Sequence, residues 1–130
     1  MRKTLLLIAM LYSIATAAQA RLGSTLTEIY SEFSDNNPSM KTLDDGRKSL
    51  RVLTDRATID YVFNSNQECE VTLILPNGQG DLNYYVETYN SRYVILSAKE
   101  WRMYSSDGAI ARITIENYKD KTFFMWVPIE

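Results

Sequence analysis

The 130-residue sequence contains no histidine and only one cysteine, Cys69. Histidine is the commonest general base and zinc ligand, and it activates the nucleophile of serine and cysteine hydrolases, so its absence argues against all of these chemistries. A lone cysteine forms neither an intrachain disulfide nor a cysteine metal cluster. The glycine-rich nucleotide loops, the zinc-protease motif and the nucleophile elbow are also missing. The sequence therefore predicts a protein that is not an enzyme and that binds no metal or cofactor.

Proline, glycine and basic charge are also in short supply. The chain has 3 Pro and 5 Gly among 45% apolar and 23% charged residues, which excludes a collagen, a low-complexity segment and a disordered acidic tail. The formal net charge is −2, and it falls to −4 for residues 21–130, which hold 12 basic and 16 acidic residues. Nucleic acid and anionic membrane surfaces need a basic face, so neither is a predicted partner.

The first twenty residues have the features of a secretory signal. Arg2 and Lys3 precede an apolar run from Leu5 to Tyr12, and residues 18–20, Ala-Gln-Ala, offer the small side chains that a signal peptidase requires. The run is too short to span about 30 Å of hydrocarbon, and no later stretch is long enough. We predict a cleaved signal peptide at residues 1–20 and a single α+β domain at residues 21–130. The domain would be exported to the periplasm or the extracellular space without a stable membrane span.

Two segments have the apolar spacing of amphipathic helices. The same i, i+3, i+4, i+7 pattern occurs in Leu26, Ile29, Tyr30 and Phe33 and again, 56 residues later, in Leu82, Tyr85, Val86 and Tyr89. Ser24 and Asp81 are the predicted N-caps. The repeated spacing is compatible with an internal duplication of a helix-plus-three-strand unit or with convergence on ordinary helical spacing.

Strand-like segments with short connections fill the rest of the chain. They cover residues 50–53, 58–63, 68–75, 93–96, 101–104, 109–115 and 122–127. Links this short make neighbouring strands antiparallel. The predicted fold is an α+β two-layer sandwich, with one mostly antiparallel sheet of about six strands, two helices on one face, and the order α-β-β-β-α-β-β-β. This order resembles secreted inhibitor-type domains of the β-lactamase-inhibitor and PepSY-like kind, a resemblance of element order without a shared motif.

The last strand is apolar on both faces. Phe123, Met125 and Val127 alternate with Phe124 and Trp126, and only one side can meet the helices. The other side is either exposed or covered, for example by a loop that would make a second small core. Flat exposed rings suit sugar faces and protein partners. The candidate binding residues are Phe124, Trp126, Trp101, Tyr84 and Tyr104.

Cys69 and three acids are the remaining candidates for reactive groups. Cys69 is in phase with Val71, Leu73 and Leu75, which predicts a small buried hydrophobe rather than a reactive thiol. Asp60, Glu68 and Glu70 are predicted on the outward side of adjacent strands, where two carboxylates could serve as acid and base. The sequence favours instead an ordinary solvated sheet face, with these acids paired to Arg51 or Arg112.

Three functions remain on the sequence alone. The first is an exported non-catalytic binding domain whose partner is another exported protein or a second copy of the chain. The second is a glycan or small-ligand binder that uses the candidate aromatics. The third is an enzyme that works with carboxylates only, which the missing histidine and the small size disfavour. We predict the first.

Overall fold

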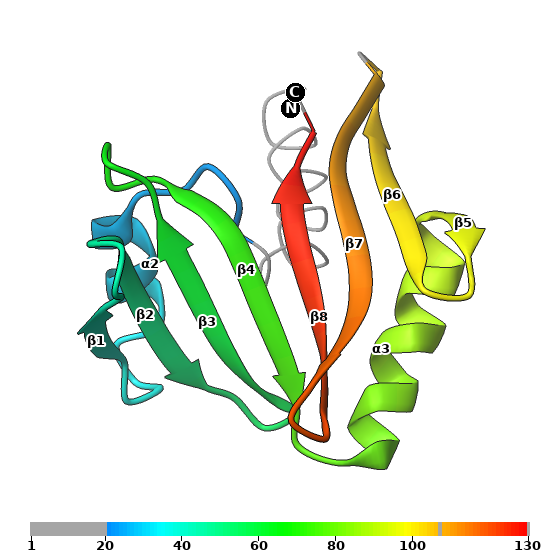
Figure 1. Ribbon diagram of the computed structural model, residues 1–130, viewed down its shortest axis with the longest axis horizontal. Coiled ribbons are helices and arrows are strands. Elements are labelled where there is room, and N and C mark those ends of the chain that lie inside the picture. Colours follow the sequence, from blue (N-terminus) through cyan, green and yellow to red (C-terminus); the bar gives the residue numbers. More distant parts are fainter. Residues whose placement is uncertain (1–20, 107, 130) are drawn as a thin grey trace, which may run out of the picture.

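The computed structural model describes residues 21–106 and 108–129, which form two helices and one eight-stranded antiparallel sheet (Figure 1). The elements are α2 (Leu26–Glu32), β1 (Ser39–Thr42), β2 (Lys48–Leu53), β3 (Ala57–Phe63), β4 (Cys69–Pro76), α3 (Gln79–Arg92), β5 (Val94–Ser97), β6 (Glu100–Ser105), β7 (Gly108–Tyr118) and β8 (Lys121–Pro128). The strand order in the sheet is β1-β2-β3-β4-β8-β7-β6-β5. The predicted α+β class and antiparallel sheet are confirmed, and the predicted signal peptide lies outside the described residues.

The prediction of about six strands is too low. The sheet gains β1, a four-residue edge strand in which every residue is exposed. A strand without a buried face has no alternation of apolar and polar residues, so the sequence gives no period-two signal there. Pairing with β2, from Ser39 opposite Arg51 to Thr42 opposite Lys48, holds β1 in place instead.

The sheet consists of two similar halves. In each half a helix precedes four strands, and β4 and β8, the last strands of the two halves, pair with each other in the middle of the sheet. Both central strands have eight residues and end in a proline. Leu73 lies opposite Met125, with one further pair on either side. Each half therefore has a helix followed by four strands, one strand more than the predicted unit, and the strand order of one half mirrors that of the other about this central pair.

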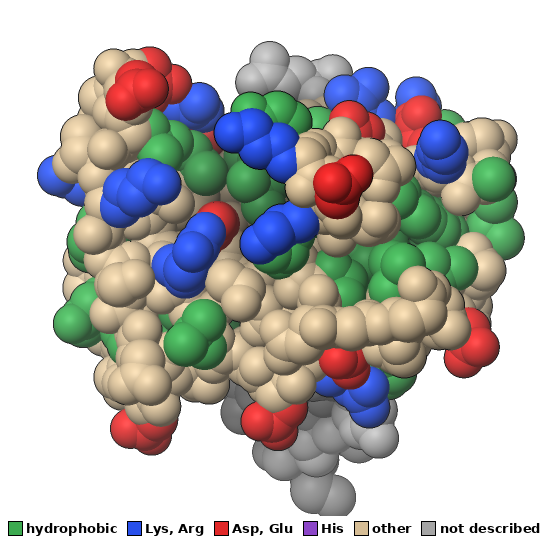
Figure 2. Space-filling model, turned by 60° about the horizontal axis from the view of Figure 1, so that its bottom comes forward, with side chains coloured by type: hydrophobic (Ala, Val, Ile, Leu, Met, Phe, Trp, Pro, Cys, Tyr) green, Lys and Arg blue, Asp and Glu red, His purple; other side chains and the backbone are tan. Residues whose placement is uncertain are grey.

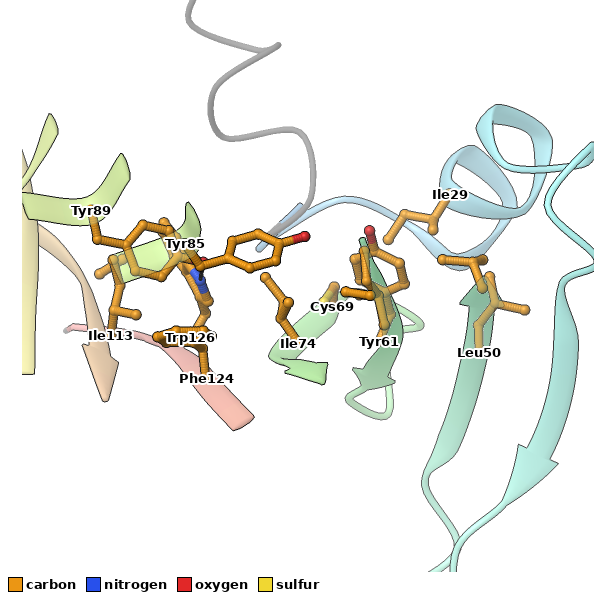
Figure 3. Packing of buried hydrophobic residues seen from close by; sticks show 14 of the residues in the cluster. Ile29, Leu50, Tyr61, Cys69, Ile74, Tyr85, Tyr89, Ile113, Phe124 and Trp126 are labelled. Atoms are coloured by element: carbon orange, nitrogen blue, oxygen red, sulfur yellow. Dashed lines mark hydrogen bonds between the residues drawn. The ribbon is translucent and has the colours of Figure 1, made fainter. Parts of the chain in front are cut away.

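Both helices pack on the same face of the sheet, as predicted. The ring of Phe33, directly after α2, stacks on Tyr61 of β3 at a centroid distance of 5.9 Å. On α3, Tyr89 contacts the rings of Phe124 and Trp126 on β8 at 5.1 and 5.6 Å. The strand register places these ring partners on one side of the sheet, because Tyr61 is opposite Thr72 and Thr72 is opposite Trp126. Phe124 is two residues from Trp126 on β8 and therefore points to the same side. One apolar core therefore runs beneath both helices (Figure 3).

The helices begin at different residues from those predicted. Thr25, not Ser24, is the N-cap of α2, and it forms a capping box with Glu28, whose backbone N–H donates to Thr25 Oγ1 over 3.2 Å. Helix α3 begins after Gly78 without a side-chain cap. Asp81 is in its first turn and pairs with Arg56 at 3.3 Å. A carboxylate in the first turn still stabilises the helix through the partial positive charge at its N-terminus.

The predicted phase of β4 is wrong beyond Cys69. Phe63 is opposite Cys69, but the preceding Val62 is opposite Val71, so Glu70 is the extra residue of a β-bulge. A bulge inserts one residue and moves every later side chain to the other face. Thr72 and Ile74 consequently lie in the core, whereas Val71, Leu73 and Leu75 lie on the face away from the helices.

Alanine substitution of the two neighbours Ile74 and Leu73 tests this register. Ile74 is fully buried and Leu73 is half-buried. We expect Ile74→Ala to lower the free energy of unfolding by about 2–5 kcal/mol because it leaves a cavity in the core. Leu73→Ala should cost about 1 kcal/mol, since the residue borders solvent. Urea unfolding of both variants measures the difference, and a larger loss for Leu73→Ala would contradict the register.

Candidate binding face

The face of the sheet opposite both helices, the open face, has an apolar centre. The two central strands each contribute three side chains, here named the central stripe: Val71, Leu73 and Leu75 of β4 and Phe123, Met125 and Val127 of β8. All six are half-buried. The solvated face of an antiparallel sheet is normally polar, so a contiguous apolar stripe on it marks a surface suited to contact with another molecule. In Figure 2, apolar side chains lie next to Lys and Arg side chains on the surface seen from the lower end of Figure 1.

Charged side chains flank the central stripe, and on the β2–β3 side they are paired. The guanidinium of Arg51 donates two hydrogen bonds to the Asp60 carboxylate, at 2.8 and 2.9 Å. Arg47, just before β2, bonds both Asp45 and Glu70, at 2.7 and 2.8 Å. These hydrogen bonds raise the pKa of both guanidinium groups above the usual value. This flank is therefore close to electrically neutral.

The β6–β7 flank carries arginines in a different arrangement. Arg102 and Arg112 lie directly opposite each other, on the face away from the buried pair of Trp101 and Ile113. Glu100 Oε2 is 3.8 Å from Arg102 Nε, beyond hydrogen-bond distance. The described part of the chain gives Arg112 no ion pair. The two flanks thus differ in how far their arginines are neutralised.

Three of the five aromatic candidates are buried in the core. Phe124, Trp126 and Trp101 are 0%, 2% and 1% exposed, so their rings are not available for stacking with a ligand. They pack under α3 in the main core, not under a loop in a second one. The indole N–H groups donate to partners on this helix, Trp126 to Tyr89 Oη at 3.1 Å and Trp101 to Asn90 Oδ1 at 2.8 Å. Burial raises the pKa of Tyr89, which keeps its hydroxyl neutral.

Tyr84 and Tyr104 remain accessible, but the structure does not bring them together with the central stripe. Tyr84, on α3, has the guanidinium of Arg56 at 3.7 Å from its ring centroid, which occupies one ring face. Its other contact is an edge-to-face arrangement with Tyr85. Tyr104 lies on β6 and is exposed. Tyr84 therefore links the β2–β3 turn to α3 through a cation–π contact.

Cys69 is buried, as predicted, although its neighbours on β4 are not in phase with it. Its sulfur lies 3.3 Å from Thr72 Oγ1 and 3.5 Å from the Val71 carbonyl oxygen. Burial raises the pKa of the thiol to about 11, an effect larger than the opposing hydrogen bonds. A thiol held in its neutral form is a poor nucleophile.

The three predicted acids do not meet in a common site. Asp60 is bonded to Arg51, which is one of the predicted partners, and Glu70 is bonded to Arg47. Glu68 precedes β4 and forms an isolated bridge with Thr25. Their arrangement is that of a solvated sheet surface with ion pairs, not of an acid and a base facing a shared substrate.

A polar hollow of about 400 Å³ lies where β4 ends and the β7–β8 turn begins. Its walls include Leu75, Gln79, Leu82 and Lys121. The turn itself, Lys119 and Asp120, has positive φ angles of 50° and 65°, the conformation of a two-residue hairpin turn that usually takes Asn-Gly. The ionisable residues in its wall, Asp120 and Lys121, are both exposed.

Among the described residues, no three His, Cys, Asp or Glu side chains come together as metal ligands. In the same part of the chain, no helix is long and apolar enough to cross a membrane. Comparison with known proteins finds no matching family model, no matching curated protein and no matching solved structure.

The reactivity of Cys69 tests its environment. With a pKa of about 11, on the order of one thiol in a thousand is ionised at pH 8. We expect the native protein to react with Ellman's reagent only as fast as it opens, and the urea-unfolded protein to react at once. Cys69→Ser, which should give no signal in either state, is the control. Rapid stoichiometric labelling of the native protein would contradict a buried thiol.

Proposed function

We propose that this protein is an exported, non-catalytic binding domain that recognises another protein through the open face. The central stripe carries this proposal. It places six half-buried apolar side chains side by side on the face that neither described helix covers. Covering such a stripe with a partner releases water from apolar surface, and the flanking charges supply specificity.

A glycan or small-ligand binder is the weaker alternative. Stacking on sugars requires accessible rings, and Phe124, Trp126 and Trp101 are in the core. Phe123 is the one aromatic residue of the central stripe, and the rest of the stripe is aliphatic or Met. A mixed aliphatic surface with one ring fits a protein surface better than it fits a sugar.

Self-association has a specific feature in its favour, the edge strand β5. Val94, Ile95 and Leu96 are 49%, 54% and 46% exposed, and β5 contains no charged residue. The opposite edge strand, β1, contains Lys41. Natural sheets commonly place charge on an edge to prevent pairing with another chain. The β5 edge is therefore a second surface through which a copy of this chain could bind.

Site-specific photo-crosslinking in the native host tests the binding function. The photoreactive residue p-benzoylphenylalanine replaces Met125 in the central stripe, Ile95 on the β5 edge, or Tyr30 on α2 as an exposed control. We expect Met125 to give a discrete adduct with another protein and Tyr30 to give none. An adduct of twice the monomer mass from Ile95 would identify a second copy as partner. Absence of adducts from Met125, or the same adducts from Tyr30, would refute the open face as the binding surface.

Export is supported by the basic start, the apolar run and the small residues at positions 18 and 20. We expect the protein recovered from the periplasm or the medium to begin at Arg21, as determined by N-terminal sequencing and intact mass. Replacing Ala20 with a bulky residue such as Ala20→Trp should block processing and leave the precursor in the cell. A full-length protein in the cytoplasm would contradict the export prediction.

A further inference from the structure

The β6–β7 flank of the open face contains two like charges in direct apposition. Arg102 and Arg112 are cross-strand partners on antiparallel strands, and their neighbours in register, Trp101 and Ile113, point into the core. Both arginine side chains therefore leave the sheet on the same side. Like charges directly opposite each other destabilise a sheet. Retaining such a pair lowers stability unless some other group neutralises it.

The described part of the chain neutralises this pair only in part, through the ion pair of Arg102 with Glu100. Arg102 Nε is shielded from water but donates no hydrogen bond, and Glu100 Oε2 is 3.8 Å away. Next to it, Thr114, which lies opposite Glu100, has a buried hydroxyl oxygen that also lacks a hydrogen-bond partner. Buried polar atoms are normally hydrogen-bonded, so two unpartnered ones beside a pair of like charges that is only partly compensated indicate a missing partner.

The other flank serves as an internal comparison. There the Asp60 carboxylate receives two hydrogen bonds from Arg51 across the strand, at 2.8 and 2.9 Å. Asp60 is opposite Arg51 just as Arg112 is opposite Arg102. Where the β2–β3 flank supplies a carboxylate from the chain itself, the β6–β7 flank supplies a second guanidinium. Glu116 is four residues from Arg112 along β7. At the rise of a strand their Cα atoms are about 13 Å apart, which is too far for Glu116 to take the place that Asp60 has on the other flank.

Apolar side chains lie on either side of the arginine pair. Val94 of β5 is opposite Arg102, and Val127 of the central stripe is opposite Arg112. The row across the open face is therefore apolar, basic, basic and apolar. A complementary surface has an acidic group between apolar side chains.

We propose that Arg102 and Arg112 form a carboxylate-binding site that receives an Asp or Glu side chain, flanked by apolar residues, from the protein partner that docks on the open face. This proposal rests on the proposed function and specifies the chemistry of the partner. Guanidinium groups bind carboxylates through paired, charge-assisted hydrogen bonds. The same contact relieves the repulsion between the two arginines, so both effects favour binding of the partner.

Selection from a phage-displayed library of random peptides tests the partner chemistry. We expect the wild-type protein to enrich peptides with Asp or Glu between apolar residues. The double variant Arg102→Glu and Arg112→Glu should enrich Lys or Arg at that position instead, since reversing the site reverses the preferred charge. An acidic peptide selected on the wild type should lose about tenfold in affinity for Arg112→Gln. The matched control is Arg92→Gln, an exposed arginine in the last turn of α3 on the helix side of the sheet, which should leave the affinity unchanged.

The central stripe separates the failure of this proposal from the failure of the proposed function. If selected peptides lose binding to Met125→Asn but show no acidic preference, the open face binds proteins and the carboxylate site is refuted. If Met125→Asn does not weaken the selected peptides, or if none are selected, both proposals are refuted. Enrichment of the same acidic sequences by the charge-reversed double variant would also refute the carboxylate site.

Stability provides a readout that does not need a ligand. Arg112→Gln removes a repulsive pair, so we expect the folding equilibrium constant to rise about two- to fivefold at low ionic strength and to change little at high salt. Arg51→Gln removes an attractive pair and should lower it. The measurement is urea unfolding at the two salt concentrations. A loss of stability in Arg112→Gln as large as that in Arg51→Gln would mean that Arg112 has a stabilising partner within the chain, and would overturn the proposal.

Discussion

The pairing of β4 with β8 determines the architecture of this protein. It joins two helix-plus-four-strand halves edge to edge into one sheet, with Leu73 opposite Met125 at the middle. The helices of both halves pack on the same side of this sheet. One side of the sheet then has a continuous core, while neither helix of residues 21–129 covers the other side. The open face is thus a direct result of how the halves are joined.

The sequence predicts the elements better than it predicts their orientation. The α3 stripe was correct because Tyr85 and Tyr89 are buried at helical spacing. On β4 and β8, both faces of the strand are apolar, so periodicity cannot decide which face meets the helices. The bulge at Glu70 decides it for β4, and it depends on pairing with β3, which is not a local property of the sequence. Phe124 and Trp126 were consequently candidates for exposure although they are core residues.

The candidate site is less predictable than the fold, because it consists of relations across strands. Arg51 was a predicted partner of Asp60, and the two are nine residues apart in a hairpin. Arg102 and Arg112 are at a similar separation, but a bulge between Met103 and Tyr104 shifts the β6–β7 register. Counting residues outward from the turn therefore does not predict that the two arginines lie opposite each other. The apolar residues of the central stripe were visible in the sequence, but Val71, Leu73 and Leu75 were assigned to the core. Each error has the same origin, a register that only tertiary pairing fixes.

The central strand pair also has a consequence for the order of events in folding. Neighbouring strands β2, β3 and β4 are joined by short turns, as are β6, β7 and β8, so each set can form with little loss of chain entropy. Leu73 and Met125, in contrast, are about fifty residues apart in the chain, and contacts between such distant residues form slowly. We therefore expect the two hairpin sets to collapse first and to meet last. Until they meet, each exposes one apolar central strand as a free edge, and in that interval the chain is most vulnerable to aggregation.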